Sequence, residues 1–132
     1  MDMPRFTLRR TLAAIILFLG LPIAAEAAQP FDQVAFQAAQ EAGKDILVDV
    51  AASWCPVCAK QKPIIAAIES ERPDLVVFDI DFDSRKDLLA QFRVVRQSTL
   101  ILFHGGNEIA RATGQTDPDA ILALVSGQPV LP

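Results

Sequence analysis

The chain has 132 residues, a formal net charge of −4 at pH 7 and 52% hydrophobic residues. This length favours a single domain. The acidic balance and the absence of a basic run argue against a nucleic-acid-binding protein, so no nucleic-acid partner is expected.

The N-terminal segment has the composition of an export signal. Three arginines lie among the first ten residues, residues 11–25 carry no charge, and Ala-Glu-Ala at 25–27 fits the small-x-small pattern of a cleavage site. We therefore predict a signal peptide over residues 1–27, cleaved after Ala27. The product would be periplasmic or otherwise secreted, with no stable membrane insertion after cleavage.

Two alternatives stay open for this segment. It could be an uncleaved membrane anchor, but its apolar stretch of about fifteen residues contains Gly20 and Pro22 and is shorter than the roughly twenty residues that span a bilayer. Arg9-Arg10 followed by Thr11-Leu12 also resembles a twin-arginine export signal. Paired arginines are common in ordinary signal peptides, which favours the general export route.

Residues 28–132 are interpreted as one domain that begins with a helix and a strand. Asp32 has the character of a helix N-cap, apolar residues recur at helical spacing after it, and Gly43 ends the pattern. Residues 46–50 are apolar except for Asp49, which is typical of a short strand buried on both faces.

A second helix and a second strand follow. The helix is predicted from Cys55 to about Ser70, and Pro63 should kink it. In residues 75–82, apolar side chains on one face alternate with a mixed face that includes two aspartates, as in a strand.

The last part of the domain contains a helix, a hairpin and a final helix. Ser84 followed by Asp87 resembles a capping box that opens a short helix. Residues 99–103 form a third buried strand, and a glycine turn leads to a fourth strand over residues 108–113. Asp117 and the proline after it cap the last helix.

This order predicts an α/β fold with a central mixed sheet of about four strands, flanked by helices on both faces. Alternation of strands and helices implies parallel pairing through right-handed crossovers, and the closing hairpin is antiparallel.

The only two cysteines of the chain lie in Trp54-Cys55-Pro56-Val57-Cys58, soon after the first buried strand. If Cys55 caps the start of a helix, its sulfur lies among free backbone N–H groups at the positive end of the helix dipole, which stabilises a thiolate. Cys58 lies one turn along, close enough to resolve a mixed disulfide. This spacing indicates a dithiol redox site, because a structural disulfide across so short a gap would add little stability.

Together with the order of elements, this motif resembles the thioredoxin superfamily over residues 31–126. Further similarities are Pro63, five residues after the second cysteine, the strand 99–103 with Gly105-Gly106 after it, and Gly114 before the last helix. The resemblance implies a thioredoxin-like fold and thiol–disulfide exchange with protein clients, without a cofactor.

By position, the resemblance makes Cys55 the attacking thiol and Cys58 the resolving thiol of a redox-active disulfide that encloses Pro56-Val57. Trp54 matches the aromatic residue beside the site, and Asp49 matches the family's buried acid. Burial should raise the pKa of this carboxyl, so that it can accept or return the proton of Cys58. The alternatives are that Asp49 faces solvent at a strand edge and that Trp54 only fills the core.

One departure from the family pattern lies in the loop opposite the cysteines. The family usually has a cis-proline just before the equivalent of Thr99, where this chain has Ser98. A cis bond without proline costs about 2.5–4 kcal/mol, so the Gln97–Ser98 bond should be trans. Loss of the ring prompts the hypothesis that the sulfurs are open to a metal ion, although two thiolates supply only half of a tetrahedral zinc shell. A site without metal is favoured.

A second departure is Asp79, where many thioredoxins have a lysine paired with the buried acid. If Asp79 approaches Asp49, the two carboxyls would titrate as a coupled pair. The alternating pattern favours a simpler interpretation, in which Asp79, Asp81 and Asp83 form a solvated side of the strand.

These features favour an exported thiol–disulfide oxidoreductase that reduces protein disulfides and is recharged by a membrane thiol electron donor, the donor being inferred by family analogy. A buried Asp49 and the lack of histidine between the cysteines favour the reducing direction. The alternatives are a dithiol oxidase, and a metal-binding or metal-delivery protein that uses Cys55 and Cys58 as ligands.

Overall fold

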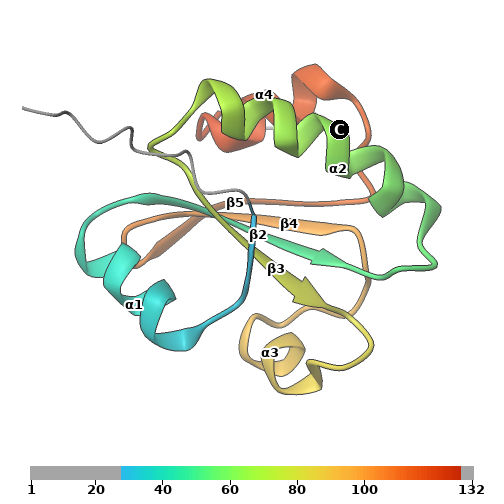
Figure 1. The fold of residues 1–132 in the computed structure, drawn as a ribbon, viewed down its shortest axis with the longest axis horizontal. Helices are drawn as coiled ribbons and strands as arrows, with labels where there is room; N and C mark the ends of the chain where they lie inside the picture. Colours follow the sequence, from blue (N-terminus) through green and yellow to red (C-terminus); the bar gives the residue numbers. More distant parts are fainter. Residues whose placement is uncertain (1–27, 129–132) are drawn as a thin grey trace, which may run out of the picture.

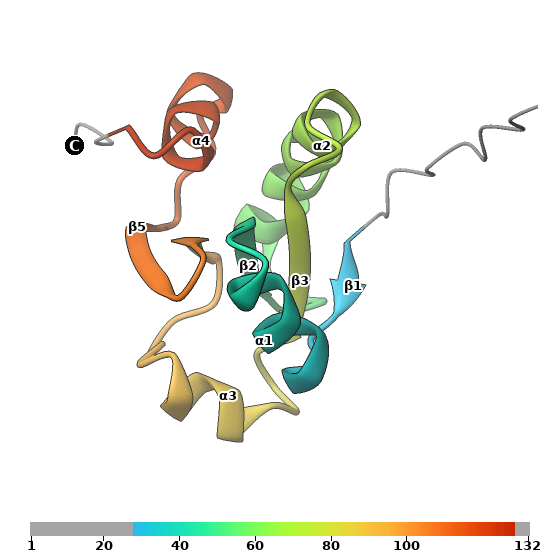
Figure 2. The ribbon, with the colours of Figure 1, turned by 90° about the vertical axis from the view of Figure 1, so that its left-hand side faces the viewer.

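The computed structural model describes residues 28–128, in which a five-stranded sheet lies between two layers of helices (Figures 1 and 2). Helices α2 and α4 cover one face, and α1 and α3 cover the other. The elements are β1 (Gln29–Pro30), α1 (Gln33–Glu41), β2 (Asp45–Ala51), α2 (Pro56–Glu71), β3 (Val76–Asp81), α3 (Lys86–Gln91), β4 (Thr99–His104), β5 (Asn107–Thr113) and α4 (Pro118–Val125).

The predicted signal peptide lies outside the described residues. Within residues 28–128, none of the helices combines the length and the hydropathy that a bilayer crossing requires.

The strand order is β1-β3-β2-β4-β5, so the predicted mixed sheet is confirmed and gains a fifth strand. Strand β1 pairs in parallel with β3, and its two residues are too few to produce a periodic sequence pattern. Strand β2 pairs in parallel with β3, which places Asp49 beside Asp79.

The expected parallel crossover between β3 and β4 is wrong, because β4 pairs antiparallel with β2. Helix α3 has six residues and therefore a length of about 9 Å, too short to carry the chain back along a strand of about 20 Å. As a result β4 starts at the carboxyl end of β2, where Thr99 lies opposite Val50.

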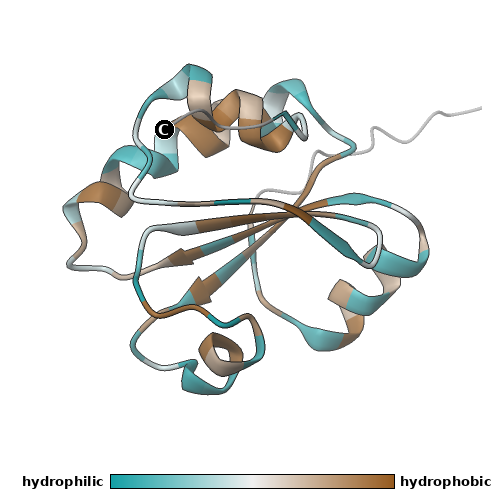
Figure 3. Ribbon diagram, turned by 180° about the vertical axis from the view of Figure 1, so that it is seen from behind, coloured by the Kyte–Doolittle hydropathy of each residue, from teal (hydrophilic) through white to brown (hydrophobic). Residues whose placement is uncertain are grey.

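The two faces of the sheet bury different side chains. Facing α1 and α3 is a cluster of five phenylalanine rings with centroid separations of 5.2–5.9 Å. Its members are Phe31, Phe36, Phe78, Phe92 and Phe103. Facing α2 and α4 are aliphatic residues such as Leu47 and Val77. Figure 3 shows hydrophobic residues along the central strands. Since side chains alternate along a strand, Asp49 and Asp79 share the α2 face with Leu47 and Val77.

Helices α1 and α4 start as the sequence predicts, and α3 does not. Asp32 accepts a hydrogen bond from the Ala35 N–H at 2.7 Å, and Asp117 caps α4 in the same way. The predicted capping box at Ser84 is wrong. Both the backbone N–H and the hydroxyl of Ser84 donate to Asp81 Oδ1 at 2.7 Å, so this side chain belongs to the turn after β3 and does not cap α3.

Candidate active site

The dithiol lies at the first turn of α2. Cys55 is the N-cap residue, with extended backbone (φ −85°, ψ 111°), and its sulfur accepts a hydrogen bond from the Cys58 N–H at 3.1 Å. Pro56 takes the first helical position, where its missing N–H costs nothing. Cys55 and Cys58 form a disulfide with a Cα–Cα distance of 5.3 Å. The expected position of Cys55 at a helix N-terminus is therefore confirmed.

Small and apolar side chains surround the two sulfurs. Ala52, Cys55 and Cys58 form one buried cluster, against which Val57 and Phe82 pack. Such surroundings exclude water from the interior side of the disulfide, so a partner must approach it from the surface.

Trp54 belongs to that surface. Its side chain is 59% exposed, and its indole N–H donates to Asp83 Oδ2 at 2.8 Å. The interpretation of Trp54 as core filler is wrong, because the residue lies in the turn before α2 and its ring is largely exposed. The hydrogen bond holds an aromatic face in solvent next in sequence to Cys55.

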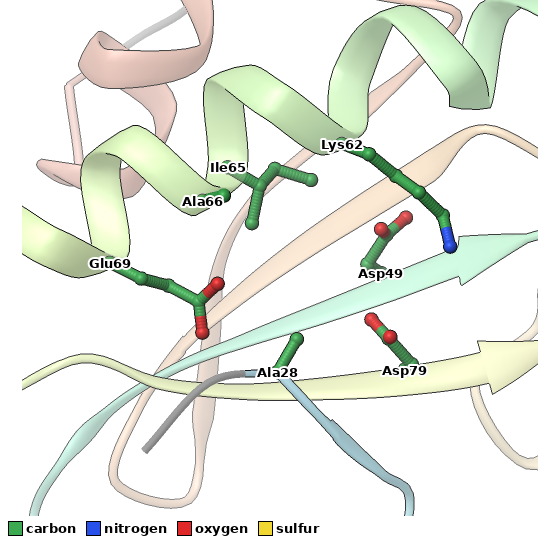
Figure 4. A pocket seen from close by; sticks show the side chains of 7 residues that line it. All are labelled: Ala28, Asp49, Lys62, Ile65, Ala66, Glu69 and Asp79. Atoms are coloured by element: carbon green, nitrogen blue, oxygen red, sulfur yellow. The ribbon is translucent and has the colours of Figure 1, made fainter. Parts of the chain in front are cut away.

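Asp49 is buried on β2 and points into a cavity beneath α2. Asp49 is 3% exposed, and its Oδ1 has no hydrogen-bond partner among residues 28–128. The cavity has a volume of about 260 Å³, and Lys62, Glu69 and Asp79 also line it (Figure 4). The expectation of a buried acid is confirmed, and the interpretation of Asp49 as a solvent-facing edge residue is wrong.

Burial is the main reason why the pKa of Asp49 is raised from 3.8 to about 7. The negative charge of Asp79 raises this pKa further, Lys62 acts in the opposite direction, and Glu69 adds a smaller increase. Asp49 therefore changes its protonation state near neutral pH, which suits a group that exchanges protons with a thiol.

The interpretation of Asp79 as a solvated residue is wrong. Asp79 is half-buried in the same cavity, directly across from Asp49 in the β2–β3 register, and burial raises its pKa. Asp81 and Asp83 are exposed as expected. The alternating pattern correctly predicted that Asp79 and Asp81 lie on the same face of β3. It could not show that α2 covers this face at Asp79 but not at Asp81.

Two members of this cavity were not identified from the sequence. Lys62 lies four residues after Cys58 on α2, and Glu69 lies seven residues further. Glu69 is 9% exposed, and its Oε1 lacks a hydrogen-bond partner in the part of the chain that the structure describes. Burial and the charge of Asp79 together raise the pKa of Glu69. The helical spacing from Cys58 through Ile65 to Glu69 was the available signal.

The loop before β4 is joined to α2 by a buried amide. The fully buried Gln61 donates through Nε2 to the carbonyl of Gln115 at 2.8 Å and to that of Ser98 at 3.3 Å. The Ser98 carbonyl also accepts the Gly114 N–H at 2.9 Å. No sequence pattern identified Gln61 as part of the site. Gln61 fixes the Ser98 loop relative to the helix that bears Cys58.

Ser98 itself has a left-handed backbone, with φ of 58°. All peptide bonds within residues 28–128 are trans, as expected for the Gln97–Ser98 bond. Proline requires φ near −65°, so this backbone cannot accept a proline at position 98 without rearrangement. Thr99 next to it is structural: its hydroxyl donates to the Arg96 carbonyl at 2.8 Å and hydrogen-bonds the Thr113 hydroxyl at 2.9 Å.

Pro63 lies inside α2, which continues through it to Glu71. It lines a hollow between α2 and α4 together with Pro118 and Leu122, so it serves the packing of the two helices. Pro63 is exposed, and within residues 28–128 it is not part of the buried cluster around the dithiol.

Within residues 28–128, the structure adds no group of metal ligands to the two cysteines. No group of three or more histidine, cysteine, aspartate or glutamate side chains in this range is arranged to hold a metal ion. Metal binding by the two cysteines would need ligands from another molecule.

Comparisons with known proteins agree with this geometry. The thioredoxin family model matches residues 25–127. A thioredoxin of Chlamydia trachomatis is 35% identical over 81 residues, which cover 61% of this chain and 79% of that protein. The crystal structure of Trxlp from Edwardsiella tarda EIB202 has a TM-score of 0.69 and 43% identity, and the match covers 72% of this chain and 94% of that one. A mutant thioredoxin from Halobacterium salinarum NRC-1 has a TM-score of 0.67 and 26% identity, over 82% and 96% of the two chains. The chain thus belongs to the thioredoxin family of thiol–disulfide oxidoreductases.

Proposed function

We propose that this protein is an exported reductase of protein disulfides. The observation that carries the proposal is the Cys55–Cys58 pair at the N-terminus of α2, where a backbone N–H already points at the Cys55 sulfur. In the reduced protein the same hydrogen bond and the helix dipole favour the Cys55 thiolate, which is the nucleophile that attacks disulfides.

The reaction has two exchanges. The Cys55 thiolate attacks one sulfur of a client disulfide, a Cys55–client bond forms, and the other client sulfur leaves as a thiolate that takes up a proton. The Cys58 thiol then loses its proton and attacks the Cys55 sulfur, which releases the second client thiol. The client gains two electrons and two protons, and the protein dithiol becomes the Cys55–Cys58 disulfide.

Asp49 is proposed as the acceptor of the Cys58 proton. Asp49 shares its cavity beneath α2 with Lys62 and Ile65, which lie one to two helical turns after Cys58. The cavity is large enough to admit water, which takes up about 30 Å³ per molecule in the liquid. With a pKa of about 7, the carboxyl can take up a proton in one half-cycle and return it in the other.

The exposed ring of Trp54 supports a protein client. A polypeptide that approaches the disulfide meets this aromatic face, which Asp83 holds in place. Aromatic side chains offer large contact areas at a low entropic cost, because few torsion angles are fixed on binding.

Export and the electron donor are part of the proposal. The charge and hydropathy pattern of residues 1–27 supports export. A reductase in an oxidising compartment must be recharged, and a membrane protein that passes electrons outward by thiol–disulfide exchange would meet this need.

The reduction potential of the Cys55–Cys58 couple tests the direction. We expect a value at or below about −230 mV after equilibration with glutathione and dithiothreitol buffers, since thioredoxin lies near about −270 mV. A value near about −120 mV would make the protein a dithiol oxidase. Reduction of insulin disulfides by the wild type, compared with a Cys55→Ser variant, tests the enzymatic activity separately.

A further inference from the structure

Two cavities meet beneath α2. The Asp49 cavity, described above, extends from Asp49 to Glu69. The Ser53 cavity has a volume of about 230 Å³ and borders the exposed Ser53 and Asp81, next to the loop that leads to the dithiol. Lys62 and Asp79 line both cavities, so this pair lies at the junction between the buried carboxyl and the surface.

The Asp49 cavity holds three carboxyl groups and one ammonium group. Asp49 Oδ1 and Glu69 Oε1 are buried and have no hydrogen-bond partner within the described range 28–128. Among the described residues, Lys62 is the only cation that lines either cavity. Because buried like charges repel one another, the three carboxyls cannot all be ionised at low cost, and the group must hold a proton near neutral pH.

Lys62 descends from α2 on the side of the two aspartates (Figure 4). Its ammonium extends toward Asp49 and Asp79, while Glu69 lies further along α2 (Figure 4). Lys62 is exposed and forms no direct ion pair with either aspartate within residues 28–128. The β4 neighbour of Asp49 is the apolar Leu100, so no charge acts on Asp49 from that strand.

We propose that Lys62 and Asp79 are positioning residues that control the exchange of the Asp49 proton with solvent during disulfide exchange. This inference rests on the proposed role of Asp49 as proton acceptor. When the Cys58 sulfur attacks Cys55, its proton passes to the Asp49 carboxylate. The neutral carboxyl then gives this proton to water at the Lys62–Asp79 junction, which restores the carboxylate.

The two charges act in opposite directions on this exchange. The Lys62 ammonium favours the Asp49 carboxylate, which can accept a proton. The Asp79 carboxylate favours the neutral acid, which retains one. Their balance sets the pH range in which Asp49 can serve the dithiol, and removal of either charge should move that range in a predictable direction.

The experiment is a pH titration of the Asp49 carboxyl carbon by NMR in ¹³C-labelled protein, in the oxidised and the reduced state. We expect Lys62→Met to move the Asp49 midpoint to higher pH, and Asp79→Asn to move it to lower pH, each by about half a pH unit or more. Lys62→Arg keeps the positive charge and should leave the Asp49 midpoint at its wild-type value. Lys60→Met is the matched control, because Lys60 is exposed on α2 and lines neither cavity, and it should leave the midpoint unchanged.

The pH–rate profile for oxidation of the reduced protein by glutathione disulfide gives a second readout, which should shift in the same directions. Unchanged Asp49 midpoints in Lys62→Met and Asp79→Asn, or an equal shift in Lys60→Met, would overturn the inference. Absence of exchange with glutathione disulfide in the wild type would refute the proposed function instead, and the titration would still be readable.

Discussion

The two faces of the central sheet are built from the same strands but differ in what they bury. The face toward α1 and α3 is aromatic, with phenylalanine rings in edge contact. All three buried side-chain atoms without a hydrogen-bond partner, among residues 28–128, belong to the face toward α2: Asp49 Oδ1, Gln61 Oε1 and Glu69 Oε1. An unpartnered buried polar group costs about 1–3 kcal/mol. The aromatic face therefore stabilises the fold, while the face toward α2 buries polar groups at a cost in stability, as the proposed proton transfer by Asp49 would require.

The largest expected effect on stability comes from the aromatic face. Phe36→Ala should lower the free energy of unfolding by about 3–5 kcal/mol, because Phe36 touches the rings of Phe31, Phe78, Phe92 and Phe103. Urea unfolding measures this loss. Val34→Ala on the same helix, 74% exposed, is the control and should change stability by less than about 0.5 kcal/mol. A reduction potential altered by Phe36→Ala would show that the two faces are not separate.

The next largest effect on stability is expected at Asp49, on the face toward α2, and it depends on pH. Because the pKa of Asp49 rises from 3.8 to about 7 on folding, the folded state binds a proton more tightly than the unfolded state. The stability due to this proton is fully present below about pH 4 and is lost as pH rises to about 7, a loss of about 4 kcal/mol. An Asp49→Asn variant should lack this loss.

Denaturation of both proteins between pH 4 and pH 8 measures the difference. The same variant should slow oxidation of the dithiol by at least about tenfold. Parallel stability curves for wild type and variant would show that Asp49 is not the titrating group.

A smaller effect is expected at the loop before β4. Ser98→Pro should destabilise the protein by about 3 kcal/mol or less, because its φ of 58° is closed to proline. Ser98→Gly, which accepts this φ freely, should stay within about 1 kcal/mol of the wild type. Thermal unfolding of the pair distinguishes backbone conformation from side-chain identity. Equal stability of both variants would contradict the account of this loop.

The smallest effect is expected at the end of the sheet away from the dithiol. Arg72 donates to Asp45 at 2.7 Å, to Asp74 at 2.8 Å and to the carbonyl of Val125 at 2.7 Å. These groups are partly exposed, so Arg72→Met should cost about 1 kcal/mol, less at high salt, and leave disulfide exchange unchanged. A loss of exchange activity in this folded variant would extend the functional region along the whole length of α2.

Local patterns made the dithiol and most of the fold predictable from the sequence. Cys55 follows a buried strand at a helix start, and apolar neighbours on both sides of Asp49 indicate its burial. The predictions of the direction of β4 and of the cap of α3 are wrong. The first fails because α3 is too short to span the sheet, and the second because the Ser84 side chain binds Asp81 instead of capping the helix.

Helical spacing places Glu69 on the Cys58 side of α2, but the sequence does not show that this side covers two aspartates. Lys62 and Glu69 are residue types that are ordinarily exposed on helices, and only the packing of α2 on β2 and β3 brings them to Asp49 and Asp79. Export, the electron donor and the reducing direction stay predictions, because they concern residues 1–27 and partners outside the fold.

The attacking thiol is identified by the alkylation rate of each cysteine in the reduced protein at pH 6, followed by mass spectrometry. Because the Cys55 sulfur lies at the N-terminus of α2 and accepts the Cys58 N–H, we expect Cys55 to react at least about tenfold faster than Cys58. Equal rates, or faster alkylation of Cys58, would contradict the assignment of Cys55 as the attacking thiol.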